Sequence, residues 1–115
     1  MPVSVQKTKL NMIPHGIKPV IYVSQYDTGQ QWVFSLLVNG EAFIVPAGAS
    51  VTIQGTRPDG ETFKDACTYS GSVVTATETE QMTAYAGNIP AELRIEKDDD
   101  SIGTLNFIIH VEEKA

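Results

Sequence analysis

Two segments near the C-terminus alternate apolar and polar side chains over almost their whole length. They cover residues 91–96 and 105–112, and the acidic run 98–100 lies between them. A period of two is that of a β-strand with one buried face. Aspartate is a favoured turn residue. The sequence therefore predicts a β-hairpin that closes an all-β domain.

Further strands are predicted upstream, where β-branched and aromatic residues gather between turn signals. Asn39-Gly40 favours a two-residue hairpin turn, and Pro58-Asp59-Gly60 favours a second turn. A short helical turn is expected over residues 82–85, and no segment of 12 or more residues has a helical period. The other predicted strands are Val20–Gln25, Gln31–Val38, Glu41–Val45, Val51–Thr56, Glu61–Tyr69 and Val73–Thr77.

This spacing of strands predicts an antiparallel β-sandwich of about seven or eight strands, preceded by an N-terminal arm. Side chains of the same parity should meet in one core. The predicted core residues are Trp32, Phe34, Leu36, Val51, Ile53, Leu93, Ile95, Leu105, Phe107 and Ile109.

At 115 residues the chain is expected to form one domain, residues 17–115, after an arm of residues 1–16. The net charge of −6 argues against general nucleic-acid binding, which needs clustered Lys and Arg. No stretch approaches the roughly 20 apolar residues of a membrane helix. The N-terminus also lacks the basic and then apolar pattern of a signal peptide, so synthesis in the cytoplasm is expected.

The arm has a charge opposite to that of the body. Lys7, Lys9 and Lys18 are the only charged side chains in the first 18 residues, whereas the rest of the chain carries a net charge of about −9. We expect residues 1–16 to add a strand to a sheet edge of the same chain or of a neighbouring copy. The alternative is a solvated terminus. The expected apolar contacts come from Val3, Val5, Leu10 and Ile13, with Lys7 and Lys9 near acids of the body.

The residues that could carry chemistry are few and isolated. His15 lies beside a proline in the arm, and His110 lies on the outward face of its strand. Cys67 is a lone strand cysteine, which is usually a small apolar residue and cannot form an intrachain disulfide. Asp98, Asp99 and Asp100, with Glu96 nearby, could bind a hard cation, but they lack the pattern of an EF-hand loop. We therefore expect no catalytic residue, no metal site and no cofactor.

Aromatic residues leave one alternative open. Trp32 alternates with Phe34 and Leu36 and is expected in the core, but Tyr22, Tyr26, Tyr69 and Tyr85 could form a platform for a sugar ring. A carbohydrate- or surface-binding module of a larger bacterial protein is therefore the second hypothesis for the function. It would require exposed aromatic side chains in a groove.

A resemblance rests on the order of several segments rather than on any one of them. These segments are Asp27-Thr28-Gly29, Trp32-Val33-Phe34-Ser35-Leu36, Val38-Asn39-Gly40-Glu41, residues 51–60 with their Arg57-Pro58-Asp59-Gly60 turn, Gly71-Ser72-Val73-Val74, Thr83-Ala84-Tyr85-Ala86-Gly87, and the closing hairpin 91–107. In this order they resemble the N-terminal domain of phage baseplate upper proteins and related siphovirus tail proteins.

The resemblance covers residues 17–112 and implies an immunoglobulin-like sandwich. It also implies a structural role, in which the module attaches tail or receptor-binding components to the particle of a phage or a prophage. The protein would then be a component of the virion, would not be an enzyme, and would bind other tail proteins and copies of itself rather than nucleic acid or membrane.

Overall fold

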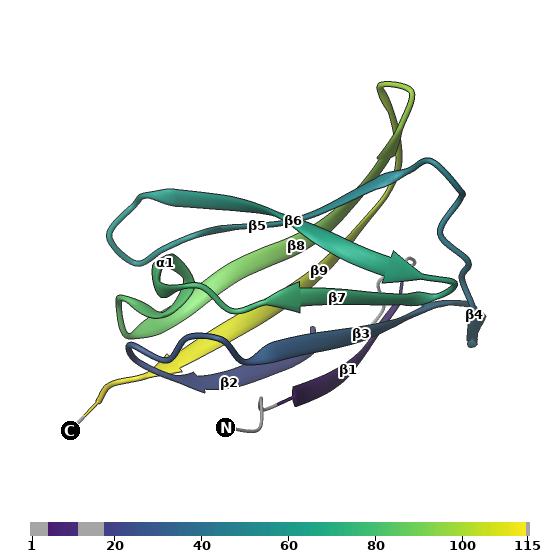
Figure 1. The fold of residues 1–115 in the computed structure, drawn as a ribbon. Helices are drawn as coiled ribbons and strands as arrows, with labels where there is room; N and C mark the ends of the chain where they lie inside the picture. Colours follow the sequence, from purple (N-terminus) through teal and green to yellow (C-terminus); the bar gives the residue numbers. More distant parts are fainter. Residues whose placement is uncertain (1–4, 12–17, 115) are drawn as a thin grey trace.

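The computed structural model describes residues 5–11 and 18–114, and within them the protein is almost entirely β-structure (Figure 1). The elements of this part are β1 (Val5–Asn11), β2 (Val20–Ser24), β3 (Gln31–Val38), β4 (Glu41–Ala42), β5 (Ser50–Thr56), β6 (Thr62–Ser70), β7 (Val73–Thr77), α1 (Glu80–Thr83), β8 (Gly87–Lys97) and β9 (Asp100–Glu112). The predicted all-β fold is confirmed.

The strands pair in the order β1-β3-β7-β6-β5-β8-β9-β2, and β4 pairs with β3. Strand β6 belongs to both layers of the sandwich. Its residues 62–67 pair with β5, and its residues 68–70 pair with β7. One side of the sandwich is therefore closed by a continuous strand. Strands β1 and β2 are the first and last strands in the order of pairing.

Two of the pairings are parallel, β1 with β3 and β2 with β9. The predicted antiparallel arrangement holds for the other pairs. Antiparallel neighbours can be joined by a tight hairpin, which fixes their direction. Neither β1 nor β2 pairs with a strand next to it in sequence, so no hairpin forces these two pairings to be antiparallel.

The closing hairpin is longer than the alternation indicated, and Figure 1 shows its tip projecting beyond the other strands. Asp98 and Asp99 form the turn with φ angles of 52° and 68°. Asn39 and Gly40 adopt φ angles of 50° and 80° between β3 and β4. Positive φ at both central residues matches the twist of a two-residue hairpin. The turns predicted at Asn39-Gly40 and in the acidic run 98–100 are therefore confirmed.

The strand predicted over residues 41–45 is mostly wrong, because β4 ends at Ala42. The amide of Phe43 still donates to the carbonyl of Leu36, at 2.9 Å, but the amide of Val45 donates to Gly71, at 3.0 Å. The chain therefore leaves β3 after two pairs of residues and crosses toward the β6–β7 turn.

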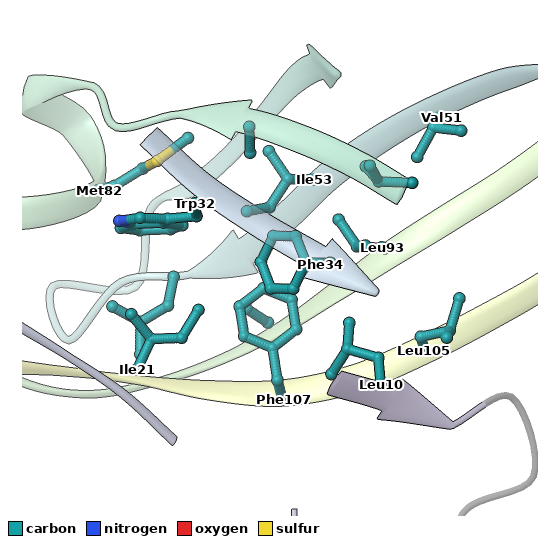
Figure 2. Close-up of a cluster of buried hydrophobic side chains, with 14 of the residues drawn as sticks. Leu10, Ile21, Trp32, Phe34, Val51, Ile53, Met82, Leu93, Leu105 and Phe107 are labelled. Carbon is teal, nitrogen blue, oxygen red and sulfur yellow. The ribbon is translucent and has the colours of Figure 1, made fainter. Parts of the chain in front are cut away.

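All ten predicted core residues are buried together, which confirms the strand parity. The rings of Phe34 and Phe107 pack with their centroids 5.0 Å apart, near the middle of the cluster in Figure 2. The core also includes Ile21 and Met82, which the prediction did not name, and Leu10, which was predicted as an apolar contact of the arm. Leu10 lies near Phe107 and Leu105 in Figure 2.

The N-terminal arm adds a strand to the sheet edge of its own chain, as one of the two predicted arrangements required. Residues Val5 to Asn11 pair with Gln31 to Leu37, and Leu10 is buried beside Leu36. Lys7 and Lys9 are exposed, and neither forms an ion pair with another described residue, so their predicted proximity to acids is not supported. Val3, Ile13 and the side chain of Val5 lie outside what the structure describes.

Candidate functional site

The structure places His110 on the outer face of β9, in a small polar row. Its Nδ1 lies 2.6 Å from Asn88 Oδ1, and its Nε2 lies 3.1 Å from Glu112 Oε1. The ring of Tyr22 packs edge-on against the imidazole at 5.6 Å. These contacts are those of a surface histidine with ordinary partners. His15 lies outside the described residues.

The acidic run forms the β8–β9 turn. Within residues 5–11 and 18–114, no three His, Cys, Asp or Glu side chains are grouped closely enough to hold a metal ion. Asp98 and Asp99 have exposed side chains and left-handed backbones. Their arrangement is explained by the hairpin turn, which needs residues that tolerate positive φ.

Cys67 is a half-buried strand residue near Asp65. Burial, and to a lesser extent the charge of Asp65, raises the pKa of the Cys67 thiol to about 12. Because the thiolate is the nucleophilic form, a thiol with this pKa is unreactive at neutral pH. Cys67 therefore behaves as a small apolar residue, as the sequence predicted.

The aromatic residues divide into buried and exposed groups. Trp32 is fully buried, as predicted, and half-buried Tyr69 donates its hydroxyl to the Ala49 carbonyl at 2.7 Å. Tyr22, Tyr26 and Tyr85 are exposed.

None of the tyrosines lines the open groove of about 420 Å³ that lies over strands β5, β6, β8 and β9. Polar side chains dominate that groove, including Gln54, Lys64, Glu92 and Asn106. The groove therefore lacks the exposed aromatic platform that the sugar-binding hypothesis requires.

The exposed tyrosines Tyr26 and Tyr85 belong to one end of the sandwich, which we call the loop end. It consists of the β2–β3 connection (residues 25–30), the β5–β6 turn (57–61) and residues 78–86 with α1. In Figure 1 these segments lie at the left, on the side where the C-terminus is marked. The Arg57 guanidinium lies over the ring of Tyr85, 5.1 Å from its centroid.

Arg57 also bonds to Asp59 within the β5–β6 turn, with Nε donating to Oδ1 at 3.0 Å. This hydrogen bond holds the pKa of Asp59 below its usual range. The same carboxylate accepts the backbone amide of Glu61 at 3.2 Å. The turn is therefore ordered by a charged pair, and it presents an Arg–Tyr contact at the surface of the loop end.

Hydrogen bonds also join the β2–β3 connection to α1. The Thr83 hydroxyl donates to the Asp27 carbonyl at 2.6 Å, and the Tyr26 amide donates to the Thr83 carbonyl at 2.9 Å. The Gln25 side-chain amide donates to the Ala84 carbonyl at 2.9 Å. Segments about 60 residues apart in sequence are therefore joined by hydrogen bonds at this end.

Glu78 lies beneath these segments and is the chemically unusual residue of the loop end. It is 2% exposed, and neither of its carboxylate oxygens has a hydrogen-bond partner among the described residues. Burial, reinforced by the charge of Asp27, raises the pKa of Glu78 to about 7. A buried carboxylate without a partner is costly in its charged form, so this residue is a candidate for a functional role.

No sequence pattern indicated that Glu78 would be buried. Residues 78–81 are polar and lie between the predicted strand 73–77 and the predicted helical turn 82–85. Glu78 is buried because β7 and β3 continue to pair beyond their regular ends, with its amide donating to the Gln30 carbonyl at 2.8 Å. That pairing depends on the tertiary structure and leaves no local pattern in the sequence.

No protein-family model and no curated protein sequence matches the chain. Among solved structures, its fold is similar to the N-terminal domain of phage TP901-1 ORF48, with a TM-score of 0.73 and 9% sequence identity. The match covers 96% of this chain and 99% of that chain. The similarity extends over nearly the whole length of the two compared chains, so this chain shares its fold with a phage protein domain. Among the described residues, no helix is long and apolar enough to cross a membrane.

Proposed function

We propose that this domain is a structural attachment module of a phage or prophage tail or baseplate, where it links tail components or receptor-binding parts to the particle. The observation that carries the proposal is the shared fold with the N-terminal domain of a phage protein, over nearly the full length of both chains. The order of turn and strand motifs in the sequence, which resembles that of phage tail proteins, supports the same proposal independently.

The proposal includes no reaction. His110 on β9, Cys67 in β6 and the acidic β8–β9 turn belong to separate elements, and each has a structural explanation in its own surroundings. A catalytic site would need a nucleophile or base together with a partner that orients it. We expect the partners to be other virion proteins and copies of the same chain, and we expect the protein to be located in the virion.

Purified particles test this proposal. Phage should be produced from the strain that carries the gene, purified on a density gradient, and analysed by mass spectrometry with the major tail protein as a positive control. We expect the protein to sediment with tails, and we expect deletion of its gene to give particles with altered or missing tail tips in electron micrographs. Its absence from purified particles, together with normal particles after deletion, would refute the proposal.

The exposure of Tyr22, Tyr26 and Tyr85 favours one alternative, a module that binds a carbohydrate or a cell surface. These side chains lie outside the groove over β5, β6, β8 and β9, which weakens this hypothesis. A glycan array probed with the full chain tests it, with the Tyr26→Ala and Tyr85→Ala variants as controls. Binding that both substitutions abolish would favour this function over attachment.

A further inference from the structure

Glu78 occupies a position that its backbone cannot leave independently. Its amide donates to the Gln30 carbonyl at 2.8 Å, and its carbonyl accepts the amide of Gly29 at 3.0 Å. The residue is therefore fixed on both sides to the β2–β3 connection. Its side chain is buried, and the hydroxyl of the adjacent Thr79 is likewise buried without a hydrogen-bond partner.

The surroundings of the Glu78 carboxyl favour its neutral form. Among the described groups, Asp27 on the β2–β3 connection is the charged residue that acts on it, and the two carry like charges when both are ionised. Smaller favourable interactions with the Gln30 backbone and the Trp32 side chain lower the pKa, but burial outweighs them. The carboxyl therefore exchanges its proton near neutral pH, with a pKa of about 7.

We propose that Glu78 is a proton-controlled switch for the loop end. When its carboxyl is protonated, Glu78 remains buried and the β2–β3 connection stays closed against α1. When the carboxyl ionises, the side chain turns toward water, which separates Gly29 and Gln30 from residue 78. The hydrogen bonds from Tyr26 and Thr83 across this end then weaken, and the exposed rings of Tyr26 and Tyr85 change their relative positions.

The direction of the effect follows from the pKa. The folded state raises the pKa of Glu78 from 4.5 to about 7, so the folded state binds the proton more tightly than the unfolded chain does. The stabilising effect of the bound proton is complete below about pH 4.5 and is lost as the pH rises through about 7. This inference concerns the loop end itself and does not depend on the proposed role in a phage particle.

Trp32 is the only tryptophan of the chain and lies close enough to Glu78 to report on it. Its fluorescence should be recorded on the full-length protein between pH 5 and pH 9. We expect a reversible change with a midpoint near pH 7, because ionisation brings a negative charge and water to the indole. The Glu78→Gln variant, whose side chain mimics the protonated acid, should remove this change.

Two further variants separate Glu78 from other groups. Asp27→Asn leaves Glu78 in place and removes the like charge, so the midpoint should move to lower pH. Glu80→Gln changes an exposed glutamate of α1, and His110→Gln changes the imidazole on β9; both should leave the midpoint unchanged.

Hydrogen exchange provides a readout of the motion itself. The amides of Gly29 and Tyr26 should exchange at least several-fold faster at pH 8 than at pH 6 after correction for intrinsic rates, and only in the chain that retains Glu78. The proposal is overturned if wild-type fluorescence and exchange show no transition, if the transition persists unchanged in Glu78→Gln, or if the Asp27→Asn midpoint stays in place.

Discussion

Leu10 on β1 pairs with Leu36 on β3 in a parallel register, and both side chains are buried, at 1% and 0% exposure. The N-terminal strand thus contributes a core residue to a layer otherwise formed by the body of the sandwich. Its neighbour Lys9 has the opposite parity and is exposed. The apolar face of the arm, rather than its charge, connects it to the domain.

This relationship predicts that Leu10→Ala lowers the free energy of unfolding by about 2–5 kcal/mol, because a buried leucine is replaced by a cavity. Lys9→Ala, which changes an exposed side chain on the same strand, should cost less than about 0.5 kcal/mol. Urea unfolding followed by circular dichroism measures both. Equal losses would show that β1 does not pack on the core in this register.

The register of the closing hairpin leads to a second prediction. Leu93 and Phe107 face the core, so changing either to alanine should cost about 2–5 kcal/mol. Arg94 faces outward and pairs with Glu92 at 3.0 Å, with a partly exposed side chain, so Arg94→Ala should cost less than about 0.5 kcal/mol. Thermal melting is sufficient for the comparison, and similar losses for Leu93 and Arg94 would contradict the assigned faces.

Gly55, near the end of β5, gives a third prediction. A Cβ atom at this position would lie 2.7 Å from the Phe63 ring and 3.1 Å from Ile89 Cγ2. Phe63 is buried and cannot move without disturbing the core, so Gly55→Ala should destabilise the fold by about 1–3 kcal/mol through overpacking. Thr56→Ala, at the exposed next position, is the matched control. A stabilising Gly55→Ala would mean that the ring has room to shift.

The core was predictable because every second residue of long strands must be apolar when one face is buried. This rule needs only local sequence, and it placed residues such as Leu93 and Phe107 correctly. It could not reveal that Val5–Asn11 runs parallel to β3, since that pairing joins segments about 25 residues apart without a hairpin. For the same reason, the sequence left open whether the arm packs on its own chain.

The candidate site was less predictable than the core. Glu78 lies in a polar stretch, and its burial results from backbone pairing with the β2–β3 connection, which no periodicity records. The exposure of Tyr26 also depends on a turn with a φ of 71°, which is unusual for a tyrosine. Residues whose environment is made by loops from distant parts of the chain require the three-dimensional structure.

Cys67 leads to a prediction about reactivity. Because burial raises its pKa to about 12, the native thiol should react with a thiol-specific disulfide reagent at pH 8 at least tenfold more slowly than the thiol of the urea-unfolded chain. Absorbance of the released chromophore gives both rates. Complete labelling of the native protein at the unfolded rate would show that the thiol is accessible and ionised.

The last prediction concerns the whole arm. Because β1 pairs with β3 of the same chain, deletion of residues 1–16 should lower the melting temperature by several degrees without changing the number of chains per particle determined by light scattering. The loss comes mainly from the buried surface of Leu10, at about 25 cal/mol per Å², together with the strand hydrogen bonds. The full-length double variant Lys7→Glu with Lys9→Glu is the control and should retain both its stability and its mass, since exposed charges contribute little. A smaller number of chains per particle with an unchanged fold would instead show that the arm joins neighbouring copies. An unchanged melting temperature and an unchanged number of chains would show that the arm contributes nothing to the domain.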